Sequence, residues 1–201
     1  MARRALVAVG LGLLAVALVP PVSRWATERS FAVHMAQHLA LGDLVPIVLV
    51  AALAPRIPRA VAVASLPVWL GDLAVWHIPG VFAAALRHSW LHGVEHAALF
   101  AAGGVLWCSI LAGSLEIGAR LVLVVGMMLG GIALASVLLW WPRVLYHPYA
   151  SADILGGMSP LTDQRTGGGI MLLEGMLVGL GAAAWLIFQL LREREDASPS
   201  P

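Results

Sequence analysis

The chain has 201 residues, of which 60% are apolar and only 11% are charged, and its mean hydropathy is +0.89. Soluble domains carry about 25% charged residues, so this composition excludes an ordinary soluble protein. A formal net charge of +1 also argues against a nucleic-acid partner, because proteins that bind nucleic acids usually carry many more basic than acidic residues. The chain is therefore expected to lie in a lipid bilayer.

Six apolar stretches are long enough to cross the hydrocarbon core of a membrane, which takes roughly 17–25 residues. They fill most of the chain, so we predict an all-α, multi-pass membrane helical bundle that forms one domain over residues 1–191. Residues 192–201, which are charged and end in serine and proline, are predicted to form a disordered tail. The expected spans are Ala5–Val22, Val33–Ala54, Ala60–His77, Gly93–Ala112, Arg120–Trp141 and Gly168–Leu191.

The first stretch permits two interpretations. Arg3 and Arg4 followed by apolar residues are typical of a signal peptide, which would be removed as residues 1–22. However, the small-x-small cleavage pattern is poor, and Pro20 and Pro21 interrupt it. We favour a retained helix.

Passing the six spans through a bilayer places every histidine of the chain on one face. With six spans both termini share the opposite face, whose short loops carry more arginines. Because short cytoplasmic loops are enriched in arginine and lysine, we predict cytoplasmic termini and histidines at the outer face. Ionisable residues gathered at one membrane depth indicate a functional site. The histidines are His34, His38, His77, His88, His92, His96 and His147.

Four of these histidines form two HxxxH pairs, His34 with His38 and His92 with His96. Residues four apart share a helix face and lie about 6 Å apart along the axis, so both rings can bind one ion. A single pair is common and could equally hydrogen-bond to carbonyl groups or lie in solvent. Two pairs at the same depth on facing helices are more specific, and they predict a site in which three or four imidazoles bind one metal ion.

Other polar side chains lie near the same depth. His77 ends a helix before Ile78-Pro79, and could join the site or belong to an interfacial aromatic belt. Asp163 could be an oxygen ligand, a partner that orients an imidazole, or the N-cap of the last helix. Glu95, beside His96, is expected to orient a ligand rather than bind the ion itself.

The remaining candidates bear on the identity of the metal. Met35 and Met171 carry thioethers that could bind Cu(I), or they could simply pack as apolar side chains. The single Cys108 lies well inside a span, so a thiolate site is excluded. Imidazole suits copper, zinc and iron alike, so the ligand type alone does not select the metal. His88 and His147 are expected to be exposed to solvent.

Short motifs occur in a fixed order between residues 31 and 190. They are His34-Met35-Ala36-Gln37-His38, Trp76-His77-Ile78-Pro79, His92-Gly93-Val94-Glu95-His96, the Tyr146–Tyr149 region, and Asp163-Gln164 with Gly169-Ile170-Met171. In this ordered set the chain resembles the CtaG family of bacterial cytochrome c oxidase assembly factors, the type first associated with caa3 oxidase.

The resemblance implies a non-enzymatic, multi-pass protein of the bacterial plasma membrane that helps to mature a haem–copper oxidase. It further implies that copper is handled for the catalytic CuB centre, with an oxidase subunit and other copper chaperones as partners. The positions carried over as copper ligands are His34, His38, His77, His92 and His96, together with Asp163.

Two other classes of function also fit imidazole-rich spans. A b-type haem protein would use histidines from two helices as axial ligands. A membrane zinc hydrolase or di-iron oxygenase would combine HxxxH pairs with an acid such as Glu95 or Asp72, although no feature of the sequence indicates a substrate pocket. Copper is the metal that the resemblance favours, and zinc and haem remain alternatives.

Overall fold

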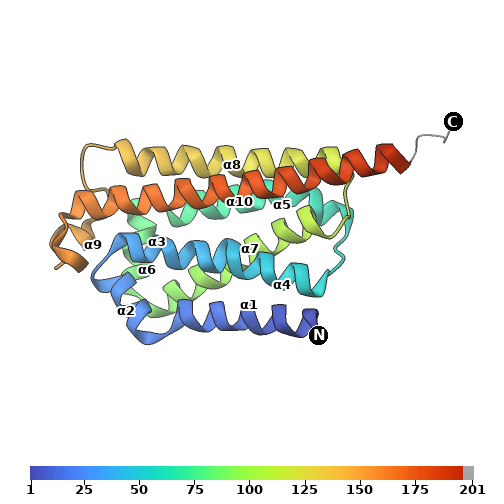
Figure 1. Ribbon diagram of the computed structural model, residues 1–201. Coiled ribbons are helices and arrows are strands. Elements are labelled where there is room, and N and C mark those ends of the chain that lie inside the picture. Colours follow the sequence, from blue (N-terminus) through green and yellow to red (C-terminus); the bar gives the residue numbers. More distant parts are fainter. Residues whose placement is uncertain (197–201) are drawn as a thin grey trace.

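The computed structural model describes residues 1–196, and the regular structure of this part of the chain is entirely helical. The predicted all-α, multi-pass bundle is therefore confirmed (Figure 1). The elements in chain order are α1 (Ala2–Leu18), α2 (Pro20–Glu28), α3 (Phe31–Leu39), the π-helix η1 (Ala40–Leu44), α4 (Val45–Leu53), α5 (Arg59–Trp76), α6 (Pro79–Arg87), α7 (Ser89–Leu111), α8 (Ile117–Trp140), α9 (His147–Ala150), the 3₁₀-helix η2 (Leu155–Gly157) and α10 (Pro160–Asp196).

Within residues 1–196, five helical segments are long and apolar enough to cross a membrane. The bent pair α1–α2 makes a sixth if it counts as one span, which agrees with the six stretches expected from the sequence. The five segments are Phe31–Leu53, Arg59–Trp76, Ser89–Leu111, Ile117–Trp140 and Pro160–Asp196.

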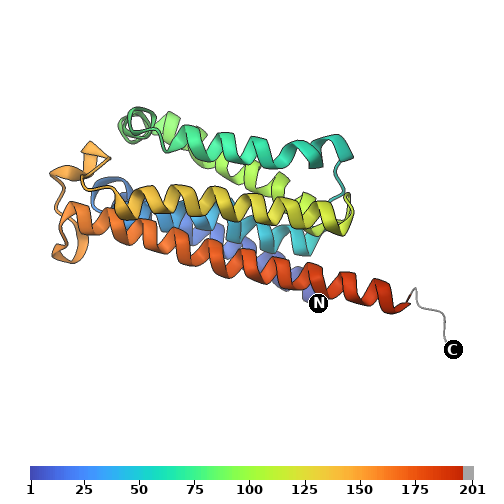
Figure 2. The same cartoon turned by 90° about the horizontal axis from the view of Figure 1, so that it is seen from above.

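The long helices run side by side, and the short elements gather at one end of the bundle. α2, α6 and α9 lie at that end, and the N-terminus lies at the other (Figure 1). α10 packs along α8 and α3, while α5 packs along α7. Figure 2 shows α8 between α5 and α10. The beginnings of α3 and α7 and the end of α5 are thus brought to the same end of the bundle.

The first span is broken where the sequence predicted a continuous helix. α1 and α2 meet at an angle of 48°, at Pro20 and Pro21, which have no N–H with which to continue the helix. The carbonyl of Ala17 would ordinarily accept from the residue at position 21. Gln37 Nε2 donates to it instead, at 2.8 Å, and so ties the first span to α3.

The last span is longer than predicted at both ends, because α10 begins at Pro160 and ends at Asp196. Gly167, which precedes the predicted span Gly168–Leu191, lies inside the helix. A Cβ on Gly167 would meet the ring of Phe31, and one on Gly168 would meet Leu138, so these glycines allow α10 to lie close against α3 and α8. Residues 192–196 are helical rather than disordered, and the rest of the predicted tail lies outside the described residues.

A close backbone contact holds the two HxxxH helices together. At the middle of Phe31–Leu53, the π-helix η1 presents the carbonyl of Gly42 to α7. A Cβ on Gly103 of α7 would overlap this carbonyl, so the approach requires glycine at that position. This contact sets the separation of the two helices about two turns below the histidines.

Candidate metal centre

Five of the seven histidines lie against one another, and we call them the histidine cluster. His34 and His38 project from α3 with ring centroids 4.2 Å apart, and His92 and His96 project from α7 with centroids 4.1 Å apart. The pairs face each other, since His34 lies 5.4 Å from His92 and His38 lies 5.7 Å from His96. His77, just after α5, lies 6.3 Å from His38.

The carboxylate of Glu95 lies among these rings and is fully buried. Its Oε1 is 3.7 Å from His38 Nε2, and its Oε2 is 3.9 Å from His92 Nε2. One potential ligand atom from each of His34, His38, His92 and Glu95 lies within 4.8 Å of the other three. The sequence suggested only an orienting role for Glu95, whereas its position also allows direct coordination.

The atoms that converge in the cluster have no hydrogen-bond partners among residues 1–196. An unpaired buried polar atom costs about 1–3 kcal/mol, so a concentration of them in one place requires a reason. A bound cation could be held by one atom each from His34, His38, His92 and Glu95, which would satisfy four of them together. The unpaired atoms are His34 Nε2, His38 Nδ1 and Nε2, His77 Nε2, His92 Nε2, His96 Nε2, and both carboxylate oxygens of Glu95.

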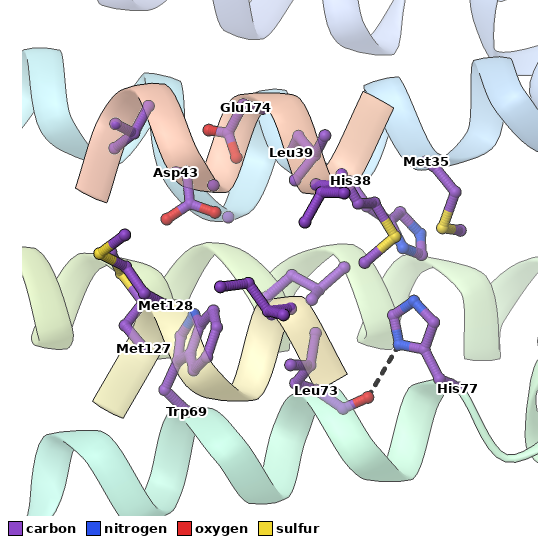
Figure 3. A pocket seen from close by; sticks show the side chains of 18 of the residues that line it. Met35, His38, Leu39, Asp43, Trp69, Leu73, His77, Met127, Met128 and Glu174 are labelled. Carbon is purple, nitrogen blue, oxygen red and sulfur yellow. Dashed lines mark hydrogen bonds between the residues drawn. The ribbon is translucent and has the colours of Figure 1, made fainter. Parts of the chain in front are cut away.

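Two of the rings are held in the tautomer that leaves Nε2 free for a metal. The hydroxyl of Tyr149 donates its only proton to the carbonyl of Ala26, so it accepts from Nδ1 of His34, at 3.2 Å. Nδ1 of His77 lies 2.8 Å from the carbonyl of Leu73, which can only accept (Figure 3). Nδ1 therefore carries the proton in both rings, and Nε2 carries the lone pair.

The connection from α8 to α10 brings aromatic side chains against the histidine cluster. Tyr146 donates to the carbonyl of His77 at 3.2 Å, and its ring stacks on Phe31 with centroids 4.8 Å apart. Phe82 packs against both Tyr146 and His34. Burial raises the pKa of Tyr146 and of Tyr149, so both hydroxyls stay protonated and keep these hydrogen bonds.

The family model described as cytochrome c oxidase caa3 assembly factor (Caa3_CtaG) matches residues 1–193. The chain belongs to this family. The match includes the first span, which lies before the motifs that carried the resemblance. No match was found among curated proteins or among solved structures.

In this member of the caa3 assembly-factor family, Asp163 does not belong to the group of converging ligand residues, which is His34, His38, His92 and Glu95. Its Oδ1 accepts from Ser30 Oγ at 2.8 Å and from the Ala32 N–H, and its Oδ2 accepts from the Phe31 N–H at 2.6 Å. Asp163 therefore caps the N-terminus of α3. The N-cap alternative is corrected, because α10, the helix that contains Asp163, begins earlier, at Pro160. The role of Asp163 as a metal ligand stays a prediction.

Two methionines and two histidines remain from the sequence prediction. Met35 is fully buried beside Phe31, and Met171 packs in the same apolar cluster. The role of these two thioethers toward Cu(I) stays a prediction. His88 and His147 are exposed, as expected.

Sequence reasoning missed the two residues that hold the surroundings of the cluster in place. Tyr149 orients His34, as described above. Gln164 Oε1 accepts from the Leu145 N–H at 2.7 Å, and its Nε2 donates to the carbonyls of Leu138 and Arg143. Both residues stand in the motifs quoted above, but their partners are remote in sequence, so the motifs alone did not reveal these roles.

Proposed function

We propose that this protein binds copper at the histidine cluster and passes it to a haem–copper oxidase during assembly. The observation that carries the proposal is the convergence of unpaired imidazole nitrogens from α3 and α7 on the carboxylate of Glu95. Membership of the caa3 assembly-factor family supports an oxidase as the recipient.

The donor set suits copper well. Among divalent first-row metals, Cu²⁺ binds nitrogen and oxygen sites most tightly, and imidazole is a good copper ligand. The cavity that adjoins the cluster has a volume of about 60 Å³, which holds a few water molecules but not a porphyrin. This favours a single ion over the b-type haem considered above.

We further propose that the cluster opens to the outer face of the bacterial plasma membrane. The cluster lies at the end of the bundle with α2, α6 and α9, opposite the N-terminus. The arginine bias of the loops supports cytoplasmic termini. Copper could then be exchanged at the membrane surface with an oxidase subunit or a copper chaperone, without crossing the bilayer.

Copper titration of the purified protein against a competing chelator tests this function. We expect one tight site per chain, and affinity about 100-fold lower or worse in His34→Ala and in His92→Ala. This estimate follows because loss of a partner that merely orients a metal ligand already costs 10–100-fold.

The two exposed histidines provide matched controls for these variants. His88→Ala and His147→Ala remove the same side chain from outside the cluster, so copper affinity should not change. Equal losses in all four variants would contradict a site at the cluster. Preferential retention of zinc in competition with copper would contradict the proposed metal. In cells, only the cluster variants should lower the yield of active oxidase.

A further inference from the structure

A cavity leads from the histidine cluster toward the middle of the bundle (Figure 3). His38 and His77 line it at the end near the cluster, and Asp43 and Glu174 line it further inside. His38 is only 6% exposed and His77 only 8%, and each has at least one unpaired ring nitrogen. The volume of about 60 Å³ is sufficient for a few water molecules beside these polar groups.

Asp43 is held on this cavity by the π-helix η1. It lies near the middle of Phe31–Leu53 and is only 8% exposed. Trp107 Nε1 donates to its Oδ1 at 2.9 Å. An extra residue in a helical turn re-aims the side chains around it, and such π-turns are frequent at functional sites. The acid is therefore built into the packing of α3 and α7.

Glu174 of α10 lines the same cavity from the opposite helix. Its Oε1 is buried and has no hydrogen-bond partner in the described part of the chain. Both carboxyl groups therefore face one cavity of about 60 Å³. Figure 3 shows both of them at the inner part of the cavity.

No arginine lines this cavity to balance two negative charges, and the chain contains no lysine. The other titratable groups that face it are Asp72 of α5, His38 of α3 and His77, while α8 contributes methionines and α7 contributes Leu99. Asp72 already accepts from Trp76 Nε1 at 2.8 Å. Two uncompensated carboxylates inside a membrane are unfavourable, so one of the pair needs a proton or another cation.

We propose that Asp43 and Glu174 hold one proton between them in the membrane interior, and release it when a cation binds at the histidine cluster. The second half of this proposal rests on the proposed function. The departing proton offsets one unit of the incoming positive charge, so the buried region gains less net charge than it would without proton release. The proton leaves through water in the cavity, toward the end of the bundle where the cation entered.

Infrared difference spectroscopy of the full-length, copper-free protein tests the first half. The carbonyl stretch of a protonated carboxyl group should be present near neutral pH. This carbonyl band should shift in Asp43→Asn and in Glu174→Gln. The intensity that comes from Asp43 and Glu174 should be lost in the double variant. Glu116→Gln, which alters an exposed carboxylate outside the cavity, should leave the spectrum unchanged. Identical carboxyl bands in the wild type and both single variants would overturn the shared proton.

Calorimetric titration with copper in two buffers of different ionisation enthalpy tests the second half. Metal binding commonly releases protons, and the wild type should release about one proton more per copper than Glu174→Gln or Asp43→Asn. If the wild type and the variants bind copper with equal proton release, the coupling is wrong and the proposed function stands. If the wild type binds no copper, the proposed function and the coupling both fail, while the infrared result still decides whether the pair holds a proton.

Discussion

At the scale of single residues, the hydroxyl group of Tyr149 connects the loop between α8 and α10, α2 and the histidine cluster. It donates to the carbonyl of Ala26 and accepts from His34 Nδ1. Tyr146 makes a different kind of contact, because its hydroxyl meets the backbone carbonyl of His77 and no imidazole nitrogen. The two tyrosines thus form a natural pair for comparison.

Tyr149→Phe should lower copper affinity by about 10–100-fold, because His34 loses the partner that fixes its tautomer and orientation. Tyr146→Phe removes a hydroxyl of equal size from the same loop and should have a much smaller effect. Chelator competition on both purified variants measures this difference. If the two variants lose affinity equally, Tyr149 acts only through packing of the loop.

Some residues of the site could be predicted from the sequence and others could not. The two HxxxH pairs were recognisable because the spacing of four places both rings on one helix face. The contact of Asp163 with the start of α3 could not be predicted, because its partner Phe31 lies 132 residues away in the sequence. The sequence predicted that Glu95 lies at the same membrane depth as the histidines. Only the packing of α3 against α7 shows that its carboxylate faces His38 and His92.

At the scale of elements, the predicted spans were close to the observed helices, because length and apolar composition define both. The π-helix η1 has no comparable sequence signal, since it depends on tertiary packing against α7. The glycines at 167–169 lie within α10, where their small size allows contact with α3 and α8. Local flexibility of glycine was outweighed by its packing role.

Gly103→Ala should reduce the free energy of unfolding by about 1–3 kcal/mol, the usual cost of overpacking a closely packed interior. The added Cβ would overlap the carbonyl of Gly42 and push α3 away from α7, so copper binding should also weaken. Gly104→Ala is the matched control, because a Cβ there meets no neighbour within 4 Å. Denaturation in detergent and copper titration compare the two. Equal stability of both variants would contradict the close contact.

At the scale of the whole molecule, the alternation of spans brings polar side chains from distant parts of the chain to one end of an otherwise apolar bundle. His34 and His96 are separated by two crossings of the membrane, yet both belong to the cluster. The sequence predicted this common end from the number of spans alone. It could not predict which histidines touch, because that depends on helix rotation and on the position of α5.

Cysteine labelling in intact cells tests the proposed orientation. In a Cys108→Ser background, Ser151→Cys places a thiol in the loop next to α9, and Glu116→Cys places one at the opposite end, before α8. Both positions are exposed. A membrane-impermeant maleimide should label position 151 and spare position 116 until the membrane is permeabilised. The reverse pattern would place the histidine cluster at the cytoplasmic face.

X-ray absorption at the copper edge of the copper-loaded, full-length protein tests the central claim most directly. We expect a coordination shell of nitrogen and oxygen, with the outer scattering typical of several imidazole rings. That imidazole scattering should decrease in His92→Ala and remain unchanged in His88→Ala. A shell dominated by sulfur, or imidazole scattering that is identical in all three proteins, would contradict copper binding at the histidine cluster.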